Sequence, residues 1–270
     1  MRKIGMLLSC FILLSAFTCD NEPLEGDFDN TNGGNNNVIG DPGGETTGDY
    51  WPMAIGNIWT YSVVEDGVTQ DNSIMDIVQT ETISNNLYYQ YDTFFGDVTA
   101  TDGTGFEGLS VNVYSRKNGG DYVIKVGELT ADLLGLYQIT QEGYEYIILK
   151  DYLDIGGTWS HTMSVETSFE VSIPGGEALP TTVSNYDMQF EILDKDLTIE
   201  VQGETYDSVI KVRQIFNVTV QGDPSAGSQS NYIYYFAKDV GVVKVDGTIN
   251  DLDDGITSNS VQELISYSLN

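Results

Sequence analysis

The feature that most constrains the fold of this chain is the alternation of apolar and polar side chains over residues 163–173. The odd positions are apolar apart from Thr167, and every even position is Ser or Glu. Successive side chains of a strand point to opposite faces, so this run predicts a strand with one buried and one solvated face. Similar runs, separated by turn residues, lie at residues 59–63, 72–83, 87–95, 111–115, 122–126, 186–193, 197–201, 210–220 and 233–236. The domain is therefore predicted to be all-β.

The predicted strands are expected to form one antiparallel sheet, because long strands joined by short connections favour a meander. About a dozen strands are too many for a flat sheet, so we expect a half-barrel or barrel, with a β-sandwich as the alternative. Residues 144–149 are apolar at nearly every position, which indicates a strand covered on both faces. The one helical turn that we predict is residues 130–136, capped by Thr130 with its leucines facing inward.

The β-domain is predicted to begin within residues 49–61, where a glycine-rich leader without lysine gives way to strand-like sequence. Pro52 has no amide hydrogen and suits the first residue or the exposed edge of a strand. From Trp59 onward the alternation predicts Trp59, Tyr61 and Val63 on one face.

A short sequence feature of this start occurs a second time. Residues 156–159 repeat the Gly-x-x-Trp spacing of residues 56–59, and both copies precede an alternating run. A duplicated strand start explains the repeat, and chance spacing of two tryptophans is the alternative.

Residues 1–19 have the features of an export signal. Arg2 and Lys3 precede an apolar run over residues 4–17, which is shorter than the roughly 20 residues of a bilayer-spanning helix but fits a secretory signal peptide. A membrane-anchoring helix is the alternative. The sequence Ala-Phe-Thr-Cys ending at Cys19 resembles a bacterial lipobox, which implies that Cys19 is lipidated and becomes the mature N-terminus. An ordinary cysteine near a cleavage site is the alternative.

Residues 20–48 contain seven acidic residues and no Lys or Arg. Such a composition buries too little apolar area to offset the entropy of ordering, so we expect a disordered acidic tether between the signal peptide (1–19) and the β-domain (49–270). A calcium-binding Asp/Asn cluster is a weaker alternative, because the spacing of a calcium loop is absent. A lipidated cysteine followed by an acidic tether resembles surface-exposed lipoproteins of the Bacteroidota type. The resemblance implies an outer-membrane, cell-surface location and partners among outer-membrane proteins.

Charge and composition exclude several classes of function. The formal net charge is −30, with 11 Lys and Arg against 41 Asp and Glu, so nucleic acids and anionic lipid headgroups are poor partners. The only cysteines are Cys10 and Cys19. Beyond residue 19 there is therefore no disulfide, cysteine nucleophile or thiolate metal site. His161 is the single histidine, which excludes any mechanism that needs two imidazoles.

Three groups of side chains are weighed as candidates for chemistry. His161 is either a general base or a packing residue on a strand. Glu142 and Glu145 are either a glycosidase acid–base pair or chance neighbours among many acids. The third group is either a calcium site or a solvated acidic turn before Gly255, and consists of Asp251, Asp253 and Asp254.

Two further features bear on binding. The 17 tyrosines are either a platform that stacks on sugars or strand residues with high β propensity. Residues 96–109 contain several glycines and are a loop candidate large enough to carry function.

The two ends of the β-domain show a second resemblance. Residues 52–61 read Pro-x-x-x-Gly-x-x-Trp-x-Tyr, and residues 234–244 form an aromatic strand, a tight turn and Gly-x-Val-Lys. This combination resembles a broad group of secreted bacterial β-proteins, some of them distantly similar to the curved-sheet lipid-handling proteins of the periplasm. The resemblance implies a concave sheet able to hold an apolar ligand, and no catalytic residue comes with it.

The sequence thus predicts a non-enzymatic outer-membrane surface lipoprotein that acts as a binding or accessory module of a surface assembly, without a cofactor or metal. The first alternative is a carrier of lipid or another apolar ligand in a curved sheet. The second alternative is a calcium-dependent glycan binder or hydrolase.

Overall fold

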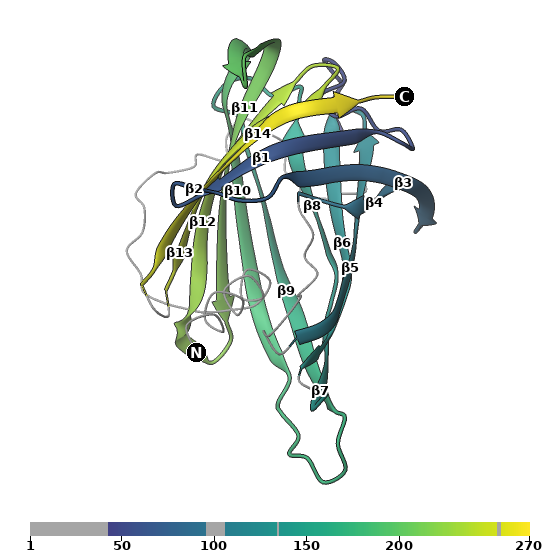
Figure 1. Ribbon diagram of the computed structural model, residues 1–270, viewed down its shortest axis with the longest axis vertical. Helices are drawn as coiled ribbons and strands as arrows, with labels where there is room; N and C mark the ends of the chain where they lie inside the picture. The colour runs from purple at the N-terminus through teal and green to yellow at the C-terminus, as the bar shows by residue number, and fades with distance from the viewer. Residues whose placement is uncertain (1–42, 96–105, 134, 253–254) are drawn as a thin grey trace.

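The computed structural model describes residues 43–95, 106–133, 135–252 and 255–270, and these ranges form fourteen strands and no helix (Figure 1). The strands are β1 (Ile58–Glu65), β2 (Val68–Thr69), β3 (Ser73–Ile83), β4 (Asn86–Thr93), β5 (Phe106–Asn118), β6 (Asp121–Leu133), β7 (Tyr137–Gln141), β8 (Tyr144–Lys150), β9 (Thr158–Val171), β10 (Thr182–Val201), β11 (Glu204–Val220), β12 (Asp223–Ala237), β13 (Gly241–Asp251) and β14 (Thr257–Ser268). No helix in the described part of the chain has the length and apolarity needed to cross a membrane.

Twelve of these strands close into one antiparallel β-barrel. Neighbouring strands follow the order β14-β13-β12-β11-β10-β9-β7-β6-β5-β4-β3-β1, and β1 completes the ring by pairing with β14 from Ile58 opposite Ser268 to Glu65 opposite Ser260. β2 and β8 lie outside this path, and β8 pairs with β6. The prediction of an all-β antiparallel barrel is confirmed, and the sandwich alternative is wrong.

The barrel wall follows the alternation in the sequence. In β9, Trp159, Val165 and Thr167 are buried, whereas Ser164 and Glu166 are exposed. The strand-like runs at residues 72–83 and 87–95 also form strands, and these pair with each other as a hairpin. β3 and β4 join through Ser84 and Asn85, which have φ values of 49° and 66°, the backbone twist that a two-residue hairpin turn requires.

The predicted helical turn at residues 130–136 is wrong. Thr130 and Leu133 belong to β6, where Thr130 pairs with Ser110 of β5 and Thr140 of β7. A threonine before a leucine-rich stretch is a good helix start locally, but pairing with strands on both sides outweighs a helix propensity of less than about 1 kcal/mol per residue.

Aromatic side chains pack inside the barrel around the chain segment that precedes β1. Trp51 is fully buried and its ring lies 6.0–6.5 Å from the rings of Tyr91, Phe94, Phe95 and Phe236. Trp51 precedes the first strand, because β1 begins at Ile58 and residues 49–57 are not extended into it. The expectation that Pro52 stands at the start or edge of a strand is therefore wrong, and this segment contributes core side chains instead.

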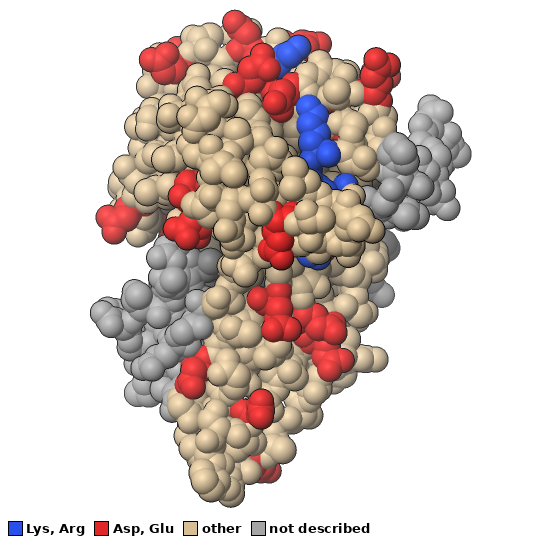
Figure 2. All heavy atoms as spheres, turned by 90° about the vertical axis from the view of Figure 1, so that its right-hand side faces the viewer, with Lys and Arg blue, Asp and Glu red and all other residues tan. Residues whose placement is uncertain are grey.

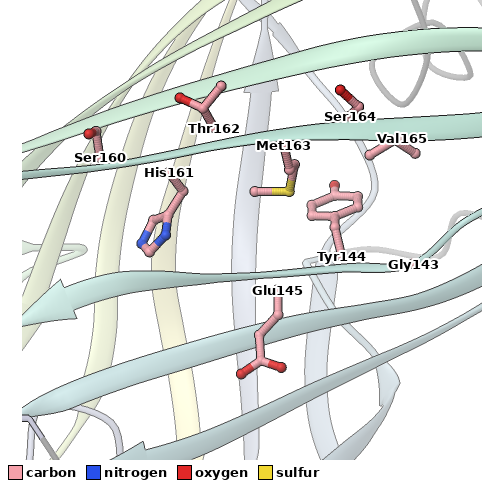
Figure 3. A pocket seen from close by; sticks show the side chains of 9 residues that line it. All are labelled: Gly143, Tyr144, Glu145, Ser160, His161, Thr162, Met163, Ser164 and Val165. Carbon is pink, nitrogen blue, oxygen red and sulfur yellow. The ribbon is translucent and has the colours of Figure 1, made fainter. Parts of the chain in front are cut away.

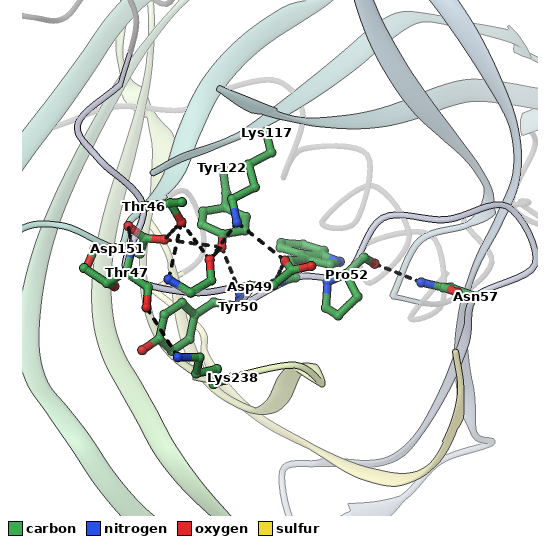
Figure 4. A network of polar contacts seen from close by, with 12 residues as sticks. Thr46, Thr47, Asp49, Tyr50, Pro52, Asn57, Lys117, Tyr122, Asp151 and Lys238 are labelled. Atoms are coloured by element: carbon green, nitrogen blue, oxygen red, sulfur yellow. Dashed lines mark hydrogen bonds and ion pairs between the residues drawn. The ribbon is translucent and has the colours of Figure 1, made fainter. Parts of the chain in front are cut away.

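Polar contacts hold the chain before β1 against the barrel (Figure 4). The buried carboxylate of Asp151 accepts hydrogen bonds from Thr46 Oγ1 (2.6 Å) and Thr47 N (3.1 Å). Tyr122 accepts from Tyr50 N at 2.8 Å, and Lys117 donates to Gly48 O at 2.6 Å. Contacts with the barrel therefore begin before residue 49.

The strand opposite β6 is interrupted. β7 and the first part of β8, as far as Ile147, pair with β6 in one register, but pairing stops at Glu142 and Gly143. A Cβ atom on Gly143 would lie 2.6 Å from the carbonyl oxygen of Val126 and 2.8 Å from the carbonyl carbon of Gly127. Only glycine permits this close approach of two backbones, so the sequence itself builds a break into the wall.

Candidate functional site

The break between β7 and β8 leaves a seam in the barrel wall between β8 and β9. β9 pairs with β10 along one edge and with β7 along the lower part of the other, ending with a bond from Glu142 N to Glu166 O (2.9 Å). Above this point, as far as Ile147, no backbone hydrogen bond between the described residues joins β8 to β9. Two neighbouring strands of a closed barrel are normally joined by a ladder of such bonds.

Side chains replace the missing ladder at one position. Trp159 Nε1 donates to the carbonyl of Ile147 at 2.8 Å, and the amide of Ile147 donates to His161 Nε2 at 3.0 Å. Continuing the β7–β9 register, in which Gln141 pairs with Thr167, along both strands places Ile147 opposite His161. The two rings therefore occupy the space that backbone bonds would bridge, and they satisfy both polar groups of Ile147.

Below this contact the seam opens into a pocket of about 460 Å³, which we call the β8–β9 pocket (Figure 3). Its walls are Gly143, Tyr144 and Glu145 on the β8 side and residues 160–165 of β9. Figure 3 shows the Tyr144 hydroxyl directed toward Met163 between the two strands, with Glu145 on the opposite side of its strand. Pockets for small ligands are commonly about 300–1,000 Å³, so the β8–β9 pocket falls within this range.

Aromatic side chains line the barrel interior beside the pocket. Tyr144 makes an edge contact with Tyr186 (5.2 Å between ring centroids), and Tyr186 makes another with Phe216 (5.2 Å). These rings and their neighbours point inward, yet several are only half-buried: Tyr144, Tyr146, Met163, Phe216, Tyr232 and Tyr234. An inward side chain that keeps part of its surface accessible borders solvent-sized space, so such space lies beside these rings and next to the β8–β9 pocket, and we call it the aromatic hollow.

The interior hydroxyl groups are held in their neutral form. Burial is the main reason that the pKa values of Tyr144, Tyr146 and Tyr186 lie well above the usual value of 10.0, and neighbouring tyrosines add to the shift in each case. The Tyr234 hydroxyl donates to Gln214 Oε1 at 3.0 Å, and its pKa is raised for the same reasons. The lining therefore offers apolar ring faces and uncharged donors.

His161 is a buried packing residue, as one of its two interpretations predicted. It is 6% exposed, its ring meets Phe190 edge-on at 6.2 Å, and its Nε2 lone pair is used by the Ile147 amide. Burial, and to a smaller extent the charge of Lys150, lowers the pKa of His161 to about 4. The imidazole is thus neutral at pH 7 and serves as a hydrogen-bond acceptor in the seam.

The two glutamates weighed as a glycosidase pair have separate roles. Glu145 accepts from Arg116 (3.2 Å) and Tyr88 (2.9 Å), and it lies 3.9 Å from Lys125. Glu142 is exposed and accepts weakly from Glu166 N at 3.3 Å. Because Glu145 is committed to two cations on the outer wall, the arrangement does not resemble two carboxylates facing one glycosidic bond.

The remaining candidates are only partly within the described residues. Asp251 ends β13, while Asp253 and Asp254 fall outside, as do Cys19 and residues 96–105 of the loop candidate. No group of three His, Cys, Asp or Glu side chains in the described ranges is placed to hold a metal ion. Several tyrosines line the barrel interior, where they pack with one another.

Sequence reasoning missed the β8–β9 pocket and its lining residue Met163. The local signal was present, because Glu142 and Gly143 interrupt an otherwise strand-like stretch. The partner strand at that interruption could not be read from the sequence, since β9 reaches it only through long-range pairing.

No protein-family model and no curated protein matches the chain. Two solved structures are similar. A candidate lipoprotein from Parabacteroides distasonis matches with a TM-score of 0.50 and 11% identity, over 83% of this chain and 100% of that chain. A candidate exported protein with a YmcC-like fold from Bacteroides fragilis matches with a TM-score of 0.40 and 10% identity, over 81% of this chain and 98% of that chain. At such identities the first similarity shows the fold alone.

Proposed function

We propose that this chain is a non-enzymatic, lipid-anchored binding module of the outer-membrane surface that holds an apolar ligand inside its barrel. The observation that carries the proposal is the aromatic hollow beside the β8–β9 pocket, where inward aromatic side chains such as Tyr144 and Tyr234 remain partly exposed. Burying the apolar surface of a ligand against such rings contributes roughly 25 cal/mol per Å².

The anchor and the location rest on separate support. The lipobox-like sequence ending at Cys19 and the acidic stretch after it favour export and lipidation. The barrel shares its fold with a candidate lipoprotein of Parabacteroides distasonis. A lipid anchor would hold the β8–β9 pocket near a membrane, where apolar molecules are available.

Binding is tested with the fluorescent apolar probe N-phenyl-1-naphthylamine, added to the full-length chain carrying Cys19→Ser so that no detergent is needed. We expect saturable binding with enhanced probe fluorescence. The variant Met163→Trp fills the pocket and is expected to weaken probe binding about tenfold. The matched control is Glu170→Trp, which places the same ring on the exposed face of β9. Absence of saturable binding, or equal binding by both variants, contradicts the proposal.

The anchor is tested by mass spectrometry of the N-terminus of protein isolated from bacterial membranes. We expect an acylated N-terminal cysteine at position 19 and its loss in Cys19→Ser. Cys10→Ser is the matched control and is expected to stay acylated. An unmodified, uncleaved N-terminus would contradict the proposed anchor without affecting the proposed ligand site.

A further inference from the structure

Below the aromatic hollow, the barrel interior carries a group of polar side chains that we call the polar band. Its members share an inward direction, exposures of 0–3% and the lack of a hydrogen-bond partner for their polar atoms, and they are Gln141, Thr167, Ser184, Tyr186, Ser228 and Ser230. The described residues contain eleven buried side-chain N and O atoms without a partner, and seven of them belong to this band. Such atoms are therefore concentrated at one level of the barrel.

Strand pairing brings the band together from four strands. Gln141 of β7 pairs with Thr167 of β9, and Ser184 of β10 pairs with Val165, two residues from Thr167 on the same face. Ser228 of β12 pairs with Val218, which in turn pairs with Tyr186. The band lies next to the β8–β9 pocket, because Val165 lines the pocket and Tyr144, another lining residue, contacts the Tyr186 ring.

The unpaired polar atoms of the band destabilise the folded protein when no ligand is bound. A buried polar group without a partner costs about 1–3 kcal/mol, and native proteins have few of them in one place. The Gln141 side chain lies close enough to the Tyr186 hydroxyl to lower its pKa through a weak hydrogen bond, against the larger rise caused by burial, so the hydroxyls of Thr167, Ser184, Ser228 and Ser230 are the clearest unpaired groups of the band. A group that enters the barrel and pairs with these atoms would recover the cost.

The chemistry of that group follows from the band. Hydroxyl groups both donate and accept hydrogen bonds, and the Gln141 amide does the same. None of the six side chains carries a charge at pH 7, and Asp251 pairs with Ser228 at the band's edge. Glu145 is the one acidic side chain that lines the pocket, and it pairs with Arg116 on the outer wall. The face of the molecule in Figure 2 has acidic side chains along its whole height and Lys or Arg only in its upper part. A negatively charged group is therefore disfavoured.

We infer that the ligand is amphipathic, with one apolar chain against the aromatic hollow and an uncharged, hydroxyl-bearing head group in the polar band, as in a monoacylglycerol. This inference rests on the proposed function and names the ligand class of the same site. The aromatic rings supply apolar contact, and the band selects the head group by hydrogen bonding.

Three molecules with the same twelve-carbon chain test the inference: 1-monolauroylglycerol, laurate and dodecane. Each competes with N-phenyl-1-naphthylamine for the full-length Cys19→Ser chain. We expect 1-monolauroylglycerol to displace the probe at a concentration about tenfold lower than either laurate or dodecane. If all three compete equally, or laurate competes best, the head-group inference is overturned while the apolar site stands. If the probe itself does not bind, the proposed function fails.

Variants of the polar band test whether its hydroxyl groups bind the head group of a ligand or only water. Ser184→Ala and Thr167→Val remove one hydroxyl each and are expected to weaken 1-monolauroylglycerol about fivefold while leaving dodecane unchanged. The matched control is Ser168→Ala, next to Thr167 on the outer face of β9, where its hydroxyl bonds to Thr140 O. If Ser184→Ala and Thr167→Val stabilise the fold and leave the glyceride's affinity unchanged, the band holds only water and the inference is overturned.

Discussion

Two strand starts, at residues 56–61 and 156–161, have the same local structure and opposite effects on the barrel wall. In each copy the glycine has a positive φ, 88° at Gly56 and 82° at Gly156. The glycine amide donates to the carbonyl of a buried isoleucine on the next strand, and that isoleucine's amide donates to the residue after the glycine. These bonds are Gly56 N to Ile77 O (2.7 Å) and Ile77 N to Asn57 O (3.0 Å), and Gly156 N to Ile192 O (2.8 Å) and Ile192 N to Gly157 O (2.9 Å).

The copies differ in what their inward aromatic side chains meet. Trp59 Nε1 and the Tyr61 hydroxyl donate to the carbonyls of Val240 (2.7 Å) and Val242 (2.9 Å), across a filled interior. β1 also has paired strands on both edges. In the second copy, the side chains of Trp159 and His161 bond to the edge of β8 in place of a ladder. The same turn thus closes the wall once and leaves a seam once, because the neighbouring strand, and not the turn, decides the outcome.

The largest expected effect on stability comes from replacing the two tryptophans, Trp59 and Trp159. Trp59 is fully buried, whereas Trp159 is 7% exposed and stacks on Phe190 at 5.1 Å. We expect Trp59→Ala to lower the free energy of unfolding by about 5 kcal/mol and Trp159→Ala by about 3 kcal/mol, because the seam lets water reach the second cavity. Urea denaturation measures both.

A folding failure of Trp59→Ala would leave this comparison unmeasured, so Trp59→Phe and Trp159→Phe form a milder pair with the same expected order. A larger loss at Trp159 in the milder pair would show that the seam is packed as tightly as the closed part of the wall.

The next prediction compares Tyr61 and His161, which lie two positions after the two tryptophans. His161→Leu removes the acceptor of the Ile147 amide, so we expect the free energy of unfolding to fall by about 2 kcal/mol. Tyr61→Phe removes one hydrogen-bond donor from the Val242 carbonyl but leaves no buried amide without an acceptor. We therefore expect a smaller fall in the free energy of unfolding, of about 1 kcal/mol. His161→Gln is the control, since its side-chain carbonyl accepts the same hydrogen bond. Equal losses in His161→Leu and His161→Gln would show that the bond does not hold the seam.

The alternation of apolar and polar residues predicted most strands, because the side chains of a strand that is buried on one face alternate between neighbouring positions of the sequence. It predicted the inward side chains of β9 and β10, including Val165, Met188 and Phe190. It failed at residues 130–136, where local preference favoured a helix but pairing of β6 with two neighbours decided the structure. It also failed at Trp51, which is buried without belonging to a strand.

The candidate site was less predictable than the wall. His161 is a packing residue because its Nε2 atom accepts a hydrogen bond from the Ile147 amide. The sequence near His161 does not predict this contact, because the pairing of β8 with β6 places Ile147 there. The polar band is invisible locally, because a serine such as Ser184 on an alternating strand looks like a solvent-facing residue until the barrel closes around it. A duplicated strand start remains a hypothesis.

A pH titration tests the seam with a smaller effect. The pKa of His161 is lowered from 6.5 to about 4 in the folded chain. Between these values the unfolded chain binds a proton that the folded chain does not, so the free energy of unfolding falls as the pH is lowered through this window. From pH 6.5 to 5.5 the expected loss is about 1 kcal/mol, measured by urea denaturation. His161→Gln should lose this slope, and an unchanged slope in that variant would mean that His161 is not the titrating group.

The smallest effect compares the two glycines themselves. Alanine at either position must adopt a positive φ, which costs about 1 kcal/mol in both copies. A Cβ atom at Gly156 would meet nothing within 4 Å, whereas one at Gly56 would lie 2.4 Å from Asn270 Nδ2, at the end of a side chain that bonds to Ile55 O. Gly56→Ala should therefore lower the thermal midpoint slightly more than Gly156→Ala. The double variant Gly56→Ala with Asn270→Ala should remove that difference, because only the contact with the C-terminal side chain distinguishes two turns whose backbones are otherwise bonded alike. A difference that persists in the double variant would place its origin in the neighbouring strands, β3 and β10, and would make the two turns less alike than their hydrogen bonds indicate.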